Sequence, residues 1–203
     1  MKANLSRPGS ISKLRHVRAK ARKFYAEKRS ISNNWGIDGK TFRAFHRLRP
    51  RPSELYKGWV EKHGLRKINK LTRPYTRNSF EDLHCKLVRS LELYCKKKAN
   101  RQLTIAEKFK LVDLFIKAIS RSNSITQPIN KFLVQYGHIP LDKYSLNAVK
   151  ELFYGIVVCN DPRMGNIEDK ETYTFIQSQI YLLTSKSKIP NLYFDFYAWE
   201  MNH

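Results

Sequence analysis

Apolar side chains recur along most of this chain at intervals of three and four residues, the spacing that places them on one face of an α-helix. No stretch alternates apolar and polar residues as a β-strand does, and no segment repeats. Helices are predicted at 10–29, 53–63, 78–100, 105–121, 130–137, 143–153, 168–184 and 189–200. We expect an all-α fold, a compact bundle of about seven or eight helices with a basic N-terminal extension. Residues 1–52 are predicted to form a basic arm, helix and loop, and residues 53–203 a helical domain.

One of these helices, opened by a capping box of Thr104 and Glu107, is apolar around most of its circumference. At about 100° per residue, its polar residues Lys110, Asp113 and Lys117 fall together in one narrow sector. Because the rest of the helix suits a core, we expect this polar stripe to face solvent or a cleft. Lys117 then either lies beside Lys110 as a cationic neighbour or pairs with Asp113 at i,i+4.

The composition fits one domain with a sizeable core, since 41% of the 203 residues are hydrophobic. No apolar run approaches the roughly 18 residues that span a bilayer, and the N-terminus leads into no apolar signal segment. We therefore expect a cytoplasmic protein without membrane association. Cys85, Cys95 and Cys159 lack CxxC spacing and fit reduced thiols better than a disulfide framework or a zinc site. We expect no metal and no cofactor.

Positive charge is concentrated in the first part of the chain. The 39 Lys and Arg residues outnumber the 17 Asp and Glu residues, for a net charge of +22. Residues 1–120 hold 31 basic and 9 acidic side chains, whereas residues 121–203 hold 8 of each. A field of this size attracts polyanions, so nucleic acid is the expected partner.

Two basic segments combine cations with apolar or aromatic side chains. The helix predicted at 10–29 has one apolar face and one cationic face that can meet phosphates. In the loop at 30–52, the segment FRAFHRLRPR alternates cationic with aromatic side chains, a mixture that can bind phosphates and stack on bases. Nucleic-acid contacts are predicted for Arg15, Arg18, Arg22, Lys23, Arg43, Arg47, Arg49, Arg51, Lys97 and Lys117. Base stacking is predicted for Phe45 and Trp35. The alternatives are a solvated helix face and a loop whose Phe42 and Phe45 belong to the core.

Arg77 and His84 stand at the spacing of a ribonuclease signature. With Asn78 after the arginine, they resemble the Arg-x4–6-His motif of HEPN ribonucleases. In an arginine-rich chain such a pair also arises by chance, and the alternative is a phosphate-facing Arg77 with a helix-surface His84. A HEPN-like ribonuclease is therefore the third hypothesis for function.

The segments KLVDLFIKA and, further along, HIPLDKYSL resemble the helix-hairpin-helix DNA glycosylases, most closely their 8-oxoguanine-directed branch. The resemblance covers residues 100–160. It implies that Lys110 is the lysine that attacks the sugar, and that Asp142 opens a later helix and faces the same pocket. The family's Gly-rich hairpin turn is absent from KKKANRQLTIAE, and Lys143 stands where the family often has Thr or Ser.

The chemistry implied by this resemblance is excision of a base from DNA, which is therefore favoured over RNA. The base is flipped into a pocket, a carboxylate stabilises the oxocarbenium-like sugar, and an amine attacks C1′ to form a Schiff base. We expect a DNA glycosylase, with or without lyase activity, and removal of modified bases from phage DNA is one hypothesis for the high charge. The alternative is a non-catalytic nucleic-acid-binding protein or complex subunit, with Lys110 solvated and Asp142 a simple N-cap.

Overall fold

The computed structural model describes residues 5–28, 35, 37, 50–156 and 159–202. Its helices are α1 (Ser10–His16), α2 (Arg18–Ala26), α3 (Pro52–Trp59), the π-helix η2 (Val60–Gly64), α4 (Leu65–Asn69), α5 (Arg77–Ala99), α6 (Ile105–Ile119), α7 (Gln127–Tyr136), α8 (Lys143–Leu152), the short 3-10 helix η3 (Met164–Asn166), α9 (Lys170–Lys186) and α10 (Tyr193–Met201). The described residues form no β-sheet. The predicted all-α, compact fold is confirmed.

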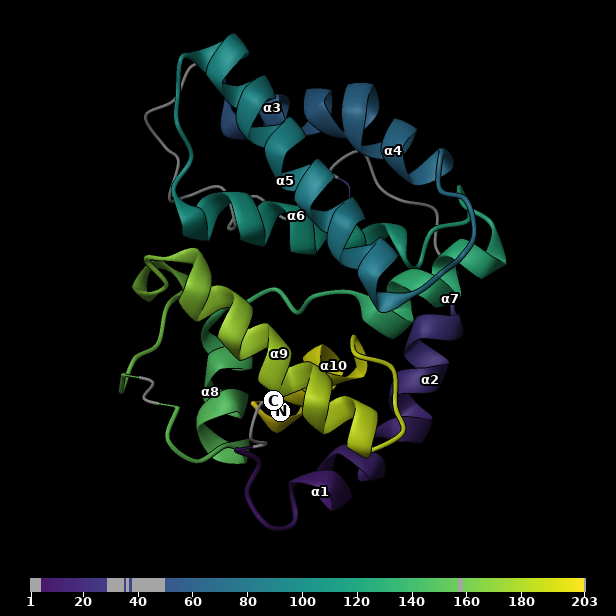
Figure 1. Cartoon of the computed structure of the whole chain (residues 1–203), viewed down its shortest axis with the longest axis vertical. Helices are drawn as coiled ribbons and strands as arrows, with labels where there is room; N and C mark the ends of the chain where they lie inside the picture. Colours follow the sequence, from purple (N-terminus) through teal and green to yellow (C-terminus); the bar gives the residue numbers. More distant parts are fainter. Residues whose placement is uncertain (1–4, 29–34, 36, 38–49, 157–158, 203) are drawn as a thin grey trace.

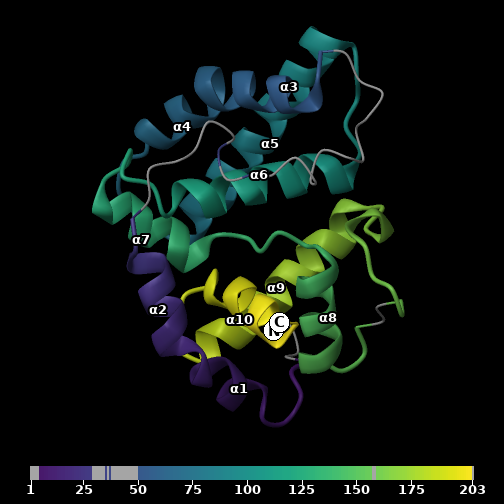
Figure 2. The same cartoon turned by 180° about the vertical axis from the view of Figure 1, so that it is seen from behind.

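The helices form two groups that lie one above the other in Figure 1 and, seen from behind, in Figure 2. The first group consists of α3, η2, α4, α5 and α6, and the second of α1, α2, α8, α9 and α10. Helix α7 lies at the side and packs against α5 and α6. One apolar core runs through both groups, from Trp59 and Phe115 in the first to Phe194 in the second. The boundary between the groups is therefore lined by packed side chains.

Residues 5–9 are fixed to the end of α8. The backbone N–H of Arg7 donates to the carbonyl of Leu152 at 2.8 Å, and Ser6 forms an isolated antiparallel bridge with Phe153. Residues 5–9 therefore pack on the bundle, where their backbone groups find hydrogen-bond partners.

The single helix predicted at 10–29 is two helices that meet at Val17. This residue is buried, and its ψ of −3° departs from the helical value of about −42°. Helix α2 packs against α10, whereas α1 packs against both α9 and α10, so the bend lets the first half of the segment also reach α9. Leu14, Ala21 and Tyr25 reach the core, as their spacing predicts. The domain boundary expected after the basic N-terminal part stays a prediction.

The helix predicted at 53–63, with Gly64 as its C-terminal stop, is longer than expected. It continues from α3 through η2 into α4 and ends at Asn69. Gly64 has helical backbone angles, and a Cβ at this position would approach the ring of Phe115 to 3.1 Å. The glycine therefore allows close packing against α6 instead of ending the helix.

Capping side chains fix where the two central helices begin. The hydroxyl of Thr104 accepts from Glu107 N at 3.2 Å, and the Glu107 carboxylate accepts from Thr104 N at 2.9 Å, which confirms the predicted capping box of α6. Helix α5 begins at Arg77, where the Thr76 hydroxyl accepts from Ser79 N at 3.2 Å. The register of α5 and α6 determines which side chains meet between them.

The three cysteines are free thiols, as their spacing predicts. Cys95 is buried on α5, and burial raises the pKa of its thiol to about 11, so this thiol is protonated at neutral pH. No described helix combines the length and the hydropathy needed to cross a bilayer.

Candidate active site

Lys110 and Asp142 line one open hollow between α6 and the start of α8. The hollow measures about 300 Å³, and its remaining walls are Lys143, Tyr144 and Arg163. This volume is at the lower end of the range for small-molecule sites. Lys110 lies in the second turn of α6 and not at the first residue of a helix, whereas Asp142 is the N-cap of α8. We refer to this place as the Lys110–Asp142 hollow.

The two oxygens of Asp142 have different surroundings. Oδ1 accepts from the backbone N–H groups of Tyr144 and Ser145, each at 3.0 Å, and so caps α8. Within the described part of the chain, Oδ2 has neither a hydrogen bond nor an ion pair. One oxygen of the carboxylate thus holds the helix, and the other is available to a ligand in the hollow.

Lys110 differs from the other two lysines of α6. Lys108 pairs with Glu92 at 3.0 Å, and Lys117 pairs with Asp195 at 2.6 Å. No carboxylate among the described residues lies within ion-pair distance of the Lys110 ammonium, which is half-buried at the wall of the hollow. Lys110 is therefore the α6 lysine whose amine is available to a bound molecule.

The polar stripe predicted on α6 divides between different environments. Lys117 does not pair with Asp113, and its partner Asp195 comes from α10. Burial raises the pKa of Asp195 and Lys117 lowers it, while the nearby charge of Asp142 raises it further. Asp113 is fully buried, so the expectation that the whole stripe faces solvent or a cleft is wrong for this residue.

The rim of the hollow carries cations and one ring. Asp161 bridges two of the cations, lying 3.0 Å from the Lys143 ammonium and 2.7 Å from the Arg163 guanidinium. Tyr144 is 39% exposed and lies on the same rim. Such a rim offers positive charge to a phosphate and an aromatic surface to a base.

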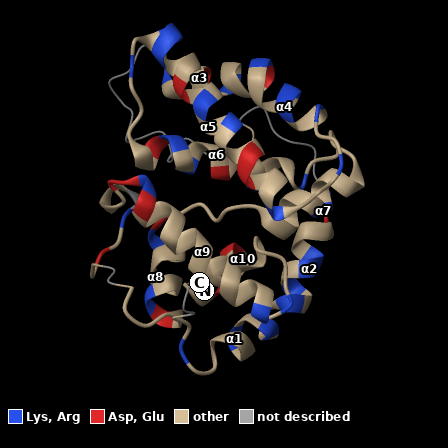
Figure 3. Ribbon diagram, in the orientation of Figure 1, with Lys and Arg blue, Asp and Glu red and all other residues tan. Residues whose placement is uncertain are grey.

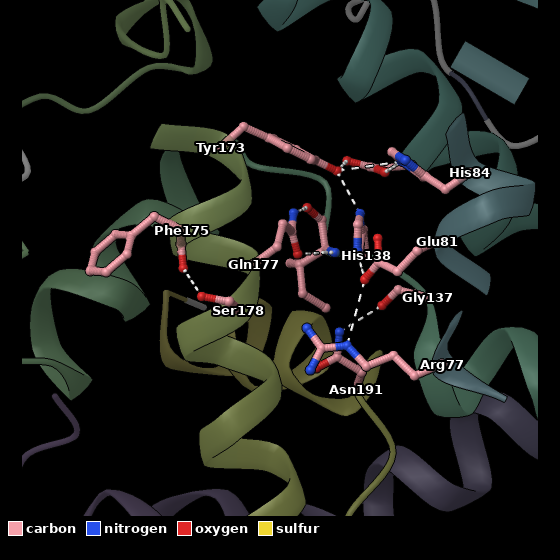
Figure 4. A network of polar contacts seen from close by, with 12 residues as sticks. Arg77, Glu81, His84, Gly137, His138, Tyr173, Phe175, Gln177, Ser178 and Asn191 are labelled. Carbon is pink, nitrogen blue, oxygen red and sulfur yellow. Dashed lines mark hydrogen bonds and ion pairs between the residues drawn. The ribbon is translucent and has the colours of Figure 1, made fainter. Parts of the chain in front are cut away.

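A second group of polar side chains, which we call the buried polar cluster, lies where α5, α6 and α9 meet the segment between α7 and α8 (Figure 4). His84 Nε2 lies 2.8 Å from Asp113 Oδ1, and the Tyr173 hydroxyl donates to Asp113 Oδ2 at 2.8 Å. His138 Nδ1 lies 3.0 Å from the same hydroxyl, and its Nε2 lies 3.2 Å from Glu81. These contacts join the two helix groups through the core.

Burial sets the protonation of this cluster. It lowers the pKa of His84, as does nearby His138, and the hydrogen bond to Asp113 offsets only part of that effect. Burial also raises the pKa of Tyr173, so the phenol keeps its proton. Burial would raise the pKa of Glu81, but the hydrogen bond from His138 outweighs it, with a smaller contribution from the Arg77 guanidinium, and the value is held at about 2. His84 and Tyr173 are thus neutral, and Glu81 is ionised at neutral pH.

His84 is not a helix-surface residue. It is 4% exposed, and its Nε2 is occupied by Asp113. Arg77 lies nearer the surface, with its guanidinium 3.7 Å from the centre of the Tyr181 ring and 3.6 Å from Glu81. A substrate cannot reach both side chains in this arrangement, so the geometry gives the HEPN hypothesis no support.

The predicted nucleic-acid contacts fall on several surfaces. Arg15, Arg18, Arg22 and Lys23 line one groove along α1 and α2, and Figure 3 shows the basic residues of these helices. Lys97 lines another groove with Lys62, His63 and Lys98, and Arg51 is exposed at the start of α3. Arg43, Phe45, Arg47 and Arg49 lie outside the described residues. Trp35 is half-buried and packs against the core, where it is only partly available for stacking.

Sequence reasoning missed the buried polar cluster and the rim residues Tyr144 and Arg163. The sequence places Asp113 on the polar stripe of its helix and pairs His84 only with Arg77. The members of the cluster come from four separate elements, and no local spacing connects them. A carboxylate in the middle of an otherwise apolar helix was the available signal, because such a group needs buried partners.

No protein-family model, curated protein or solved structure matches this chain.

Proposed function

We propose that this protein excises bases from nucleic acid, with Lys110 as nucleophile and Asp142 as the carboxylate that stabilises the sugar cation. The observation that supports the proposal most is the pairing in one hollow of an amine without a carboxylate partner and a carboxylate with one free oxygen. These are also the residues that the resemblance to helix-hairpin-helix glycosylases implies. DNA is the proposed substrate.

The reaction uses these two side chains in sequence. As the glycosidic bond breaks, the base leaves with the bonding electrons and takes up a proton from water. Asp142 Oδ2 faces the developing positive charge on the sugar and lowers its energy. The Lys110 ammonium gives a proton to the hydroxide that is left when water protonates the base, and the amine then bonds to C1′. One of its N–H protons passes to the ring oxygen as the C1′–O4′ bond breaks and the sugar opens to a Schiff base. Water hydrolyses that Schiff base, or a neighbouring proton is lost and the strand is cleaved.

The rim positions the substrate for these steps. A nucleotide that enters the hollow meets Lys143 and Arg163, whose shared partner Asp161 is exposed and can be exchanged for a phosphate. The exposed ring of Tyr144 is placed to stack on a base that has left the helix. Tyr144 thus takes the stacking role that the sequence suggested for Trp35.

Borohydride trapping on duplexes that each contain one modified or damaged base tests this proposal. The nucleic-acid-free protein is expected to form a covalent adduct on at least one duplex, and Lys110→Ala is expected to lose the adduct. Lys108→Ala is the matched control, since Lys108 lies on the same helix but is paired with Glu92. Absence of both adduct and base release across the panel, or equal trapping by Lys110→Ala, would overturn the assignment.

A non-catalytic nucleic-acid-binding role is the second candidate, and the cationic groove of α1 and α2 favours it. Helices α2 and α8 lie at opposite edges of the molecule (Figures 1 and 2), so this groove is separate from the Lys110–Asp142 hollow. Salt-dependent binding without base release would support this role.

The double variant Arg18→Glu/Arg22→Glu is expected to bind a short duplex about ten-fold more weakly or worse at moderate salt. Two lost phosphate contacts should also reduce the slope of log K against log salt by about two. Fluorescence anisotropy across a salt series measures both. Lys170→Glu/Lys186→Glu makes the same charge change on exposed lysines of α9 and should leave the slope nearly unchanged. Equal losses for the two double variants would mean that net charge, not the groove, determines binding.

A further inference from the structure

The buried polar cluster has no part in the proposed base excision, yet it brings together the side chains that hold transition metals. The ligand atoms of His84, Asp113 and His138 all lie within 4.8 Å of one another. Tyr173 places its hydroxyl against all three, at 3.5 Å from His84, 2.8 Å from Asp113 and 3.0 Å from His138. We propose that the cluster is a closed binding site for a divalent metal ion of the zinc type.

The distances fit a coordination sphere that is closed by hydrogen bonds. Four ligands at about 2.0–2.1 Å from a tetrahedral zinc ion lie about 3.3 Å from one another. The three contacts of the Tyr173 hydroxyl and the His84–Asp113 contact range from 2.8 to 3.5 Å and bracket that value, and the ligand atoms of His84, Asp113 and His138 all lie within 4.8 Å of one another. Small side-chain shifts therefore admit an ion, with two imidazoles and one carboxylate as ligands and the phenol at the fourth position.

The charge balance of the cluster also favours a cation. Asp113 is 0% exposed, and no Lys or Arg among the described residues lies within ion-pair distance of it. Its partners are the imidazole of His84 and the hydroxyl of Tyr173. A buried carboxylate without a Lys or Arg partner is costly, and a divalent ion would compensate its charge directly. Glu81, the other acidic group of the network, adds negative charge on the far side of His138.

The surroundings of His138 resemble the outer contacts of metal-bound histidines. If Nδ1 binds the ion, Nε2–H donates to Glu81, and a carboxylate partner of this kind fixes both the ring orientation and the tautomer. Gln177 clamps the adjacent backbone, because its side chain accepts from Ile139 N at 3.0 Å and donates to Ile139 O at 2.7 Å (Figure 4). The ligand is thus held in place from two sides.

The role of such an ion is structural. All four side chains are at most 8% exposed, so the site has the closed form of structural zinc centres. His84 and Asp113 belong to the first helix group, Tyr173 belongs to the second, and His138 lies on the segment that leads from one to the other. A bound ion would link the two groups across the core.

Titration of the EDTA-treated, nucleic-acid-free chain with Zn²⁺ tests the site, and Co²⁺ serves as a spectroscopic probe. We expect about one tightly bound Zn²⁺ per chain and visible absorption of tetrahedral Co²⁺. Zn²⁺ should also raise the melting temperature. Asp113→Asn and His84→Gln should each bind Zn²⁺ at least 100-fold more weakly and lose the Co²⁺ spectrum. His63→Gln, which changes a histidine outside the cluster, should bind as the wild type does.

Wild-type protein that binds less than about 0.1 equivalent of Zn²⁺ or Co²⁺, with an unchanged melting temperature, would overturn the proposal and leave a hydrogen-bonded network. Equal Zn²⁺ affinity for wild type, Asp113→Asn and His84→Gln would do the same, since the ion would then lie elsewhere. The wild-type stoichiometry and Co²⁺ spectrum need no variant, so the test holds even if a substitution prevents folding.

Discussion

Asp142→Asn is expected to slow base release at least 100-fold while the melting temperature stays within about 2 °C of the wild type. Asparagine is as good an N-cap as aspartate, and its Oδ1 can accept the same two bonds from Tyr144 N and Ser145 N. In the variant a neutral amide NH2 replaces the charged Oδ2. Loss of one electrostatic contact to a developing charge typically costs a factor of about 10²–10³ in rate. The substitution therefore separates the capping role of Asp142 from its catalytic role.

Single-turnover base release on the duplex found by trapping measures this effect, and thermal unfolding measures the cap. Asp169→Asn is the matched control, because Asp169 caps α9 through a bond from Thr172 N at 2.6 Å and does not line the hollow. We expect that control to retain wild-type activity. If Asp142→Asn releases the base as fast as the wild type, the carboxylate is an N-cap only.

The periodicity of the sequence predicted which segments are helical better than it predicted where the helices begin and end. Residues such as Leu14, Ala21 and Tyr25 are buried as their spacing requires, and the Thr104–Glu107 capping box starts α6 where expected. The bend at Val17 escaped prediction because it depends on packing against α9 and α10, which are far away in the chain. The continuation of the helix through Gly64 also escaped prediction, because the glycine is needed for close packing against the ring of Phe115, which lies far away in the chain.

The candidate site was predictable only in part. Lys110 and Asp142 came from a sequence resemblance, and the hollow that they share depends on how α6 lies against the start of α8. The buried polar cluster could not be found from local patterns. Asp113 is three residues from Lys110 and four from Lys117, so helical phase grouped it with them. Because α6 lies at the edge of the first helix group, facing the second, the polar residues of that sector meet two environments: Asp113 is buried in the core, and Lys110 lines the hollow.

Asp113→Ala is expected to lower the free energy of unfolding by about 3 kcal/mol, measured by urea denaturation in EDTA so that no metal contributes. The substitution leaves Tyr173 O–H and His84 Nε2 without their partner at 2.8 Å inside the core. Each unpaired buried group costs about 1–3 kcal/mol, and a small void adds to that. For a chain of this size the loss corresponds to a fall in melting temperature of about 10 °C.

Asp82, an exposed carboxylate on α5, provides the control for the effect of Asp113→Ala on stability. Asp82 pairs with Lys86 at 2.5 Å one turn along α5, with both side chains 63% exposed. Because water solvates each partner when the other is removed, Asp82→Ala should cost less than about 0.5 kcal/mol. Asp113 is bonded at both oxygens and fully buried, so its partners have no water to replace it. Equal effects of the two substitutions would show that the buried polar cluster contributes no more to stability than a surface ion pair, and that the helix groups are held together by apolar packing alone.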